Sequence, residues 1–436
     1  MAKTEDKYLW HVGQRPPILD QHSAVKHSIV EEYVQQYIET LMSLPTMPKL
    51  TLTLVDGFAG GGEYLSEMAE SVDGTPPLMM RATYLARASL NVGRRTPREV
   101  DAEFFFVEKR PESAEYLHRH LEKRRAEGAI ADVDYQRTTV RNAGFLDELP
   151  KIVERIKARR GGGRAIFLLD QYSYNAIPMS TLRWLMTELP NAEVIMTFNV
   201  DSLLTYISNR EPNRKAVRGV DLEEYIPWEQ LGQIKAQFGR AALQRYVAHG
   251  IKAETGAPYM TLFFVRPDSA NPWSYWLVHL SRVYKAHDVM KSLHWEHSSE
   301  FGHELEPGLF MLGYNPKRDE QYNGQSSLLF DRSGEERCIE TLTDDLGRKL
   351  SEEQQPLTVA QLFSKNISNT IADEARLQKV LRSLHSSGTI VVSNKEDRAR
   401  RPSKRYNATD IIEYSPQRHF FGSSRFRVGK FHQETA

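Results

Sequence analysis

Residues 51–64 read TLTLVDGFAGGGEY, a short apolar run that leads into an acidic residue and then into a glycine-rich turn. The apolar run predicts a buried β-strand. Because glycine lacks a Cβ, the backbone N–H groups of such a turn can approach a ligand closely at the carboxyl edge of a parallel sheet. The same glycines could also form a plain tight turn. The candidate ligand-binding residues of this stretch are Asp56, Gly57, Phe58, Ala59, Gly60, Gly61 and Gly62.

A second apolar segment helps to choose between these interpretations. Residues Ala102 to Val107 predict a buried strand, and Glu108 follows it directly. A carboxylate at this point of a nucleotide-binding sheet can accept hydrogen bonds from both hydroxyls of a ribose. The NAD-binding fingerprint needs GxGxxG with an acid about 20 residues later. Here the turn reads FAGGG and residues 71–97 form an insertion before Glu108, so the pattern favours S-adenosylmethionine as the cofactor.

The residues up to about 313 alternate between apolar runs and amphipathic stretches, which predicts an α/β fold with a parallel sheet covered by helices. Lys26 and His27 precede the first expected helix, and solvated charges at a helix end explain them as well as a functional role does. Two later segments, separated by a turn with Pro and Asn, predict an antiparallel hairpin. The expected elements are a helix over 28–42, a strand near 133–138, a helix near 145–159, a strand ending at Asp170, a helix over 179–189, a strand over 193–198 and the hairpin over 259–265 and 274–280.

At this point the chain resembles the three-Cys-motif partner protein family, TcmP. The resemblance covers most of the chain and rests on KHSIVEEYVQQYIETL, VDGFAGGGEY, FFFVEKR, FLLDQY and a C-terminal winged-helix-like unit. It implies a Rossmann-like class I methyltransferase sheet. It also implies a separate partner protein, which bears three cysteines and resembles radical S-adenosylmethionine enzymes.

Asp170, Gln171 and Tyr172 follow the fourth expected strand, whose end lies in the same crevice as the end of the first. In methyltransferases that act on the exocyclic amines of bases, an acid or amide and an aromatic ring at this place hold the amine in line with the methyl group. Asp170 could orient the acceptor, Gln171 could bond a base edge and Tyr172 could stack on it. Gln171 stands where such enzymes more often have proline. Alternatively, Asp170 caps the next helix or contacts the cofactor.

The C-terminal region predicts a small separate unit. Residues 314–356 are polar and are interpreted as a linker with one short helix, and residues 357–415 follow the winged-helix order, with a tail over 416–436. Basic side chains on the second helix and in the loop after it could contact the phosphates of a nucleic acid, although many winged helices bind only protein. These residues are Arg382, Arg398, Arg400, Arg401, Lys404 and Arg405.

Composition limits the remaining classes of function. The 436 residues are 40% hydrophobic, enough for two or three domains. The single cysteine, Cys338, excludes a disulfide scaffold or an iron–sulfur cluster within this chain. The spacing of His294 and His297 does not fit a helical zinc site, and we expect no metal. The 57 basic and 57 acidic side chains give no net field toward nucleic acid or membranes. Without a long apolar run, we expect no membrane contact and a cytoplasmic location.

Two functions remain open from the sequence. The chain could be a methyltransferase that acts on an amine of a nucleic acid or a related base beside the three-cysteine partner. It could also be a non-catalytic module that holds the cofactor to organise that partner. A nicotinamide-dependent oxidoreductase has little support in the glycine pattern.

Overall fold

The computed structural model describes residues 8–44, 46–171, 174–237, 239–265, 275–297, 301–303, 328–329, 332–403 and 405–415. The main sheet contains β1 (Lys49–Asp56), β4 (Glu99–Glu108), β5 (Thr138–Asn142), β6 (Arg164–Leu169), β7 (Asn191–Phe198), β8 (Tyr259–Val265), β9 (Tyr275–Ser281), β10 (Phe301–His303) and β11 (Leu328–Leu329). They pair in the order β11-β10-β8-β9-β7-β6-β1-β4-β5. The neighbours from β5 to β7 are parallel, and β9 is antiparallel to both β7 and β8. The expected parallel sheet and its terminal hairpin are confirmed.

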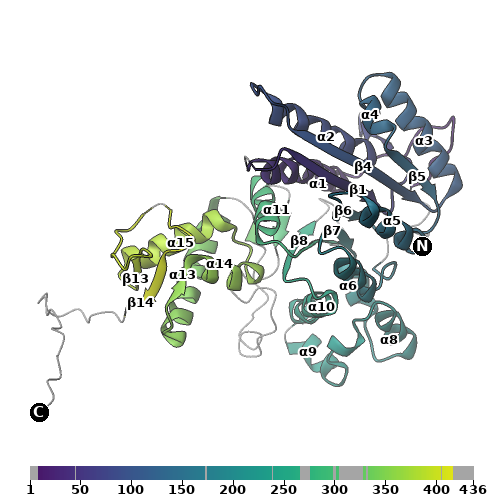
Figure 1. Ribbon diagram of the computed structural model, residues 1–436. Coiled ribbons are helices and arrows are strands. Elements are labelled where there is room, and N and C mark those ends of the chain that lie inside the picture. Colours follow the sequence, from purple (N-terminus) through teal and green to yellow (C-terminus); the bar gives the residue numbers. More distant parts are fainter. Residues whose placement is uncertain are drawn as a thin grey trace, which may run out of the picture.

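Helices cover both faces of this sheet (Figure 1). The helix α2 (Thr75–Asn91) leads from β1 to β4, and α6 (Met179–Glu188) leads from β6 to β7 in the opposite direction. Because crossovers between parallel strands are right-handed, these two helices lie on opposite faces. The helix α1 (Gln21–Met42) contacts α2 and α11 (Tyr284–Glu296), whereas α10 (Gly239–Thr255) contacts α6. The sheet therefore has a topological switch point between β1 and β6, where a ligand crevice is expected.

Several smaller elements complete the main body. The strands β2 (Glu63–Leu65) and β3 (Ser71–Asp73) form a separate hairpin between β1 and α2. The remaining helices are α3 (Pro111–Ala126), α4 (Asp132–Tyr135), α5 (Phe145–Ala158), α7 (Val200–Tyr206), α8 (Glu211–Arg218), η2 (Glu223–Tyr225), η3 (Trp228–Gln230) and α9 (Leu231–Gln237). No helix in the described part of the chain is long and apolar enough to cross a membrane.

Two expected boundaries are wrong. The strand expected near 133–138 is β5, which begins only at Thr138, because residues 132–135 form the short helix α4. The reason is Asp134, a buried carboxylate that accepts hydrogen bonds of 2.6 and 2.7 Å from the two Nη atoms of Arg87. The first helix begins at Gln21 rather than at Ser28, so Lys26 and His27 lie within it and are buried.

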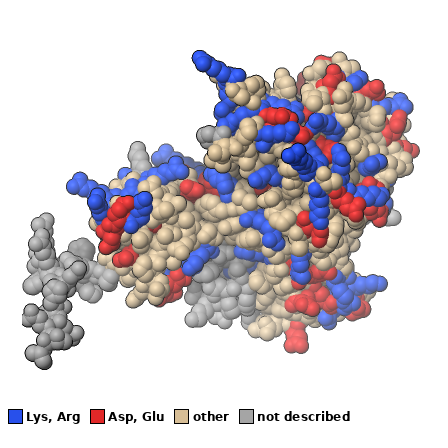
Figure 2. Space-filling view, viewed as in Figure 1, with Lys and Arg blue, Asp and Glu red and all other residues tan. Residues whose placement is uncertain are grey.

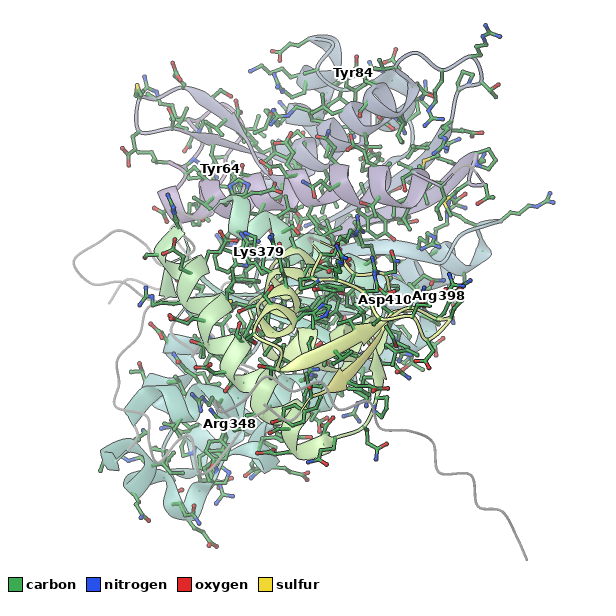
Figure 3. The ribbon with its side chains drawn as sticks, turned by 90° about the vertical axis from the view of Figure 1, so that its left-hand side faces the viewer. Tyr64, Tyr84, Arg348, Lys379, Arg398 and Asp410 are labelled. Carbon is green, nitrogen blue, oxygen red and sulfur yellow. The ribbon has the colours of Figure 1, made fainter. Side chains whose placement is uncertain are left out.

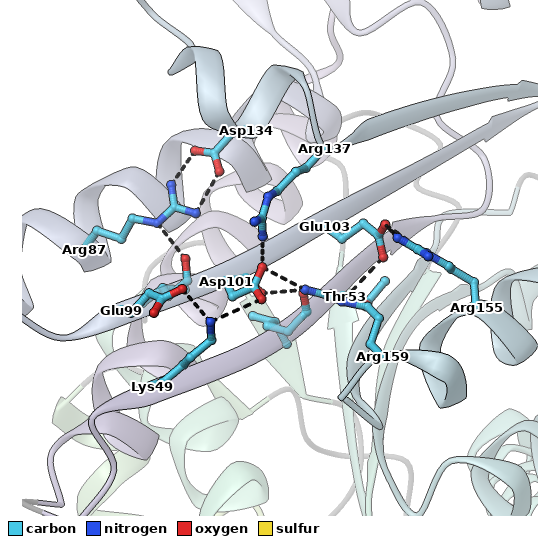
Figure 4. A network of polar contacts seen from close by, with 12 residues as sticks. Lys49, Thr53, Arg87, Glu99, Asp101, Glu103, Asp134, Arg137, Arg155 and Arg159 are labelled. Carbon is cyan, nitrogen blue, oxygen red and sulfur yellow. Dashed lines mark hydrogen bonds and ion pairs between the residues drawn. The ribbon is translucent and has the colours of Figure 1, made fainter. Parts of the chain in front are cut away.

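A network of ion pairs holds the amino-terminal edge of the sheet (Figure 4). Asp101 of β4 contacts Arg137 and lies 3.7 Å from Nζ of Lys49 and 3.1 Å from Nη2 of Arg159. Glu103 accepts a further contact of 2.7 Å from Arg155. These charges pair with one another, so they stabilise the packing of α5 on the strands. The switch point, with Asp56 and Glu108, lies at the opposite, carboxyl-terminal ends of these strands.

The C-terminal unit has the winged-helix order of three helices and three strands (Figure 1). Its first helix, α13, packs on α15 through the buried residues Cys338, Leu342, Leu346 and Leu350. The expected linker with one short helix is therefore wrong for the described residues 332–353, while the division of the chain at 313, 356 and 415 stays a prediction. The elements are α13 (Arg332–Glu353), β12 (Leu357–Thr358), α14 (Val359–Asn366), η4 (Ile367–Asn369), α15 (Glu374–Ser386), β13 (Ile390–Ser393) and β14 (Ile411–Tyr414), with the strand order β12-β14-β13.

The winged-helix unit is joined to α11 of the main body through the turn before α15. Lys291 is buried, and its Nζ donates to the backbone oxygens of Ile367, Thr370 and Ala372. Nε1 of Trp295 donates to the oxygen of Ile371 over 3.0 Å. Asp288 accepts a bond of 2.7 Å from the backbone N–H of Glu374, the first residue of α15. We call these contacts the α11 joint.

Candidate functional site

The sequence-predicted residues meet at the switch point of the sheet. Asp56 ends β1 and pairs in register with Phe106 of β4 and with Leu168 of β6. Glu108 and Asp170 therefore each lie two residues beyond the level of Asp56, one on either side of β1. The glycine-rich turn runs from Gly57 to Gly62 between them. Three adjacent strands thus bring the cofactor and acceptor candidates to one edge.

Asp56 fixes the start of the glycine-rich turn through hydrogen bonds of its side chain. Its side chain is fully buried, accepts a bond of 3.0 Å from the backbone N–H of Phe58, and accepts a short bond from the hydroxyl of Thr75. Burial raises the pKa of Asp56 to about 7, although both hydrogen bonds oppose the shift. These contacts favour a role for Asp56 in shaping the turn.

Asp56→Asn is expected to flatten the dependence of stability on pH between about 4 and 7. Because the pKa of Asp56 is higher in the folded state, the folded protein binds the proton more tightly, and the free energy of unfolding falls as pH rises from about 4 to about 7. Asparagine keeps the acceptor for Phe58 but carries no charge. The lost pH-dependent part is at most about 4 kcal/mol, since one pKa unit corresponds to about 1.4 kcal/mol.

Urea unfolding at a series of pH values measures this difference. Asp344 is exposed on α13, and Asp344→Asn serves as the matched control, with a wild-type profile expected. An Asp56→Asn profile parallel to that of the wild type would contradict the assigned pKa.

Glu108 already binds the turn but retains capacity for a ligand. Its Oε2 accepts a hydrogen bond of 3.0 Å from the backbone N–H of Gly60. Its Oε1 accepts one of 2.7 Å from the backbone N–H of Arg110. Burial raises the pKa of Glu108, while these backbone donors act in the opposite direction. A carboxylate has about four acceptor positions, so two ribose hydroxyls could still bind.

The glycines of the turn have a contact that the sequence did not predict. Gly60 and Gly62 have positive φ angles of 58° and 73°, which favour glycine. Gly61 does not, but a Cβ placed there would lie 2.2 Å from Cγ of Trp10. Trp10 is 3% exposed, and its Nε1 donates to the backbone oxygen of Glu63 over 2.6 Å. An N-terminal indole therefore lies against the turn.

Asp170 is paired with a lysine that the sequence interpretation left out. Nζ of Lys26 donates to Oδ1 and Oδ2 of Asp170 at 2.8 and 3.0 Å. Burial raises the pKa of Asp170, but Lys26 and a hydrogen bond from Thr197 outweigh burial, and the net pKa is below the usual value. The carboxylate is thus held ionised. The available signal was spacing, because Lys26 lies three and four residues before the buried Ile29 and Val30, on the same helix face.

Next to this pair lie two buried polar side chains. Burial, with help from Lys26, lowers the pKa of His27 to about 4, so its ring is neutral at pH 7. Gln171 is 1% exposed, and neither its amide nitrogen nor its amide oxygen has a hydrogen-bond partner among the described residues. Such a group is costly unless a ligand or water satisfies it. Tyr172 lies outside the described residues.

Three carboxylates act on Tyr275, at the start of β9. Burial raises the pKa of Tyr275, the first residue of β9, and the charges of Asp170, Asp20 and Asp201 raise it further. The ammonium group of Lys26 opposes the charge of these three carboxylates. Asp170 and Lys26 are paired with each other, so their charges largely offset.

The predicted nucleic-acid residues of the winged-helix unit differ in their surroundings. Arg382, Arg398 and Arg401 are exposed and form no ion pair with any residue in the described ranges. Arg405 is exposed and lies 3.9 Å from Glu374, whereas Arg400 is half-buried and pairs with Asp410. Figure 2 shows basic side chains interspersed with acidic ones on this unit, and Figure 3 labels Arg398 and Asp410. Lys404 lies outside the described residues.

The histidines of α11 pack in the core. His287 and His294 are buried, and the ring of His294 stacks on Phe263 with 3.5 Å between ring centroids. Burial lowers the pKa of His287 well below its usual value. Within the described parts of the chain, no group of three or more His, Cys, Asp or Glu side chains is placed to hold a metal ion.

Comparison with known proteins identifies one segment. Residues 313–397 match the family model of the GMT-like wHTH domain, which includes α13 as well as α14 and α15. A search of curated proteins gives no match. Helix α13 thus belongs to the matched segment and not to a linker.

Solved structures with a similar fold have low TM-scores and low sequence identities to this chain. Protein LPL1258 from Legionella pneumophila, of the family DUF519, is 9% identical, with a TM-score of 0.36 over 65% of this chain and 93% of that one. A candidate O-methyltransferase from Klebsiella pneumoniae is 12% identical, with a TM-score of 0.27 over 62% and 93%. The fold class is therefore assigned from the strand order. The chain is an α/β protein with a central, mostly parallel sheet and a C-terminal winged-helix domain.

Proposed function

We propose that this protein binds S-adenosylmethionine at the glycine-rich turn and Glu108 and transfers its methyl group to an amine of a nucleic acid or a related base. The observation that carries the proposal is the convergence of the turn, Glu108 and the Lys26–Asp170 pair at the switch point of the sheet. In this proposal Glu108 accepts the ribose hydroxyls and the turn lies against the rest of the cofactor.

The acceptor amine would lie between Asp170 and Gln171. A carboxylate accepts amine hydrogens, and the amide of Gln171, which lacks a partner among the described residues, can both donate to and accept from a base edge. No metal is needed, because methyl transfer from a sulfonium depends on placing nucleophile and methyl group in line. The exposed arginines Arg382, Arg398 and Arg401 would contact the phosphates of a nucleic acid.

A second candidate is a cofactor-binding scaffold without catalysis. It is favoured by Lys26, which occupies both oxygens of Asp170, the carboxylate that an acceptor would need. Either version would work with the three-cysteine partner that the TcmP resemblance implies. The partner and a cytoplasmic location stay predictions of the sequence.

Calorimetric titration with S-adenosylmethionine tests the part common to both versions. We expect saturable binding by the wild type and at least tenfold weaker binding by Glu108→Ala, since about 1.4 kcal/mol corresponds to a factor of ten and two hydroxyl contacts exceed that value. Glu115 lies on the exposed side of α3, and Glu115→Ala is the matched control. Absence of binding by the wild type would contradict both versions.

A further inference from the structure

The N-terminal arm, residues 8–20, lies across the hairpin that follows the glycine-rich turn. The backbone N–H of Leu19 donates to the oxygen of Leu65 over 2.8 Å, and the N–H of Leu65 donates to the oxygen of Pro17 over 2.9 Å. Ile18 and Leu65 form a parallel bridge. The arm is thus an extra partner of β2, and Trp10 extends from it over Gly60 and Gly61.

Trp10 is fixed by four kinds of contact. Its N–H bonds to Glu63 at 2.6 Å, and its ring meets Tyr64 edge to face with 5.2 Å between centroids. Its ring atoms would lie 2.8 Å from a Cβ on Gly60 and 2.2 Å from one on Gly61. Tyr8, whose hydroxyl donates to Asp20 over 2.5 Å, stacks on it with 6.3 Å between centroids. An indole held so closely restricts the conformations that the turn can adopt.

Gly61 has no backbone reason to be glycine, because its φ is not positive and any residue could adopt it. The space for its side chain is the space that the indole fills. The glycine at this position therefore fits the arm, and not only a bound nucleotide.

We propose that Trp10 is a positioning residue of the cofactor site. By packing on Gly60 and Gly61, it holds the glycine-rich turn in the conformation that binds the cofactor, so arm docking and cofactor binding stabilise each other. The second half of this statement rests on the proposed function. The first half, the packing of Trp10 in the space left by Gly61, does not.

The coupling follows from linkage. If the cofactor binds the turn only when Trp10 is docked, then binding must shift the arm toward its docked state by the same free energy. The aromatic contacts continue from Trp10 through Tyr64 to His27, with 5.7 Å between the last two rings. His27 is adjacent to Lys26 in α1, so these ring contacts connect the arm with the helix that carries Lys26.

A double-mutant cycle without cofactor tests the packing. Trp10→Ala and Gly61→Ala are each expected to speed hydrogen exchange of the Leu19 and Leu65 amides about tenfold or more, because both open the arm locally. In the Trp10→Ala background, Gly61→Ala is expected to have no further effect, since the indole that it would strike is gone. Additive effects would overturn the assignment of Gly61 to Trp10.

Matched controls exist for both substitutions. Gly232 in α9 has no heavy atom within 4 Å of a Cβ and no positive φ, so Gly232→Ala should leave exchange unchanged. Trp184 on α6 is 39% exposed and is not part of the arm, so Trp184→Ala controls for loss of an indole.

Titration with S-adenosylmethionine then tests the coupling. We expect about tenfold weaker binding by Trp10→Ala and by Gly61→Ala, a change of about 1.4 kcal/mol, with substantial rescue in Trp10→Phe. Equal affinity of the wild type and Trp10→Ala would overturn the positioning role. If the wild type binds no cofactor, the positioning role falls with the proposed function, while a non-additive exchange cycle would still establish the packing of Trp10 on Gly61.

Discussion

If the protein transfers a methyl group as proposed, Asp170→Asn is expected to lower the transfer rate at least about 100-fold, because a positioned acid or base typically contributes a factor of 10² to 10⁴. Asparagine has nearly the same shape, but it cannot carry the charge that Asp170 holds beside Lys26. Cofactor affinity should change less than about threefold, a difference under 1 kcal/mol, since Glu108 and the turn are untouched. Single-turnover transfer of a labelled methyl group to nucleic acid measures the rate, and calorimetry measures the affinity.

Lys26 variants supply the control for this result. In Lys26→Met, burial remains and the opposing cation is gone, so the pKa of Asp170 should rise. The activity lost at acidic pH should return as pH increases, whereas Asp170→Asn should stay inactive at every pH. Lys26→Arg keeps the cation and should preserve the wild-type pH profile. Transfer rates of Asp170→Asn within threefold of the wild type would contradict the role of Asp170, and absence of transfer by the wild type would favour the scaffold.

Trp295→Ala is expected to destabilise the α11 joint by about 3–5 kcal/mol, as is typical for truncation of a buried tryptophan. Trp295 is buried, bonds to the oxygen of Ile371, and lies 3.9 Å beneath the guanidinium carbon of Arg376. Its loss should uncouple the winged-helix unit from the sheet. Calorimetry should then show two thermal transitions where the wild type shows one.

Trp295→Phe separates packing from hydrogen bonding. It retains a ring beneath Arg376 but loses the bond to Ile371 and part of the buried indole, so it should cost more than about 1 kcal/mol and less than Trp295→Ala. The half-exposed Trp184 again provides the matched control, because Trp184→Ala removes an indole far from the joint. A single transition at the wild-type temperature in Trp295→Ala would show that the joint contributes little.

The central strands and their helices were predictable because their residues follow simple periods. The strand β1 alternates Leu with Thr before Val55, β4 contains the run FFFV, and β6 and β7 contain the apolar runs AIFLL and VIM; such stretches are expected in strands that are buried on both faces. The edge strand β5 was misplaced because its residues, TTVRN, contain a single apolar side chain. Helix α13 looked like a linker because its apolar stripe is narrow, with Cys338, Leu342, Leu346 and Leu350 four residues apart. That spacing was the signal that went unused.

The site was predictable only in part, for a different reason. Chain order and strand ends indicate which backbone segments meet at the switch point, so Asp56, Glu108 and Asp170 could be named from the sequence. Lys26, the partner of Asp170, comes from α1, and Trp10, which packs on the glycine-rich turn, comes from the N-terminal arm. Both reach the site through tertiary packing. A lysine or tryptophan near the N-terminus carries no sign of its partner 144 or 53 residues away.

The α11 joint also bears on how the chain can be divided. Lys291 and Asp288 supply the hydrogen bonds for the carbonyl groups before α15 and for the first N–H group of that helix. A fragment that begins at Arg332 would lack these donors and acceptors. The apolar side chains of the turn before α15 would then be exposed to solvent. Because side chains of α11 satisfy backbone groups at the start of α15, the two units are expected to fold cooperatively.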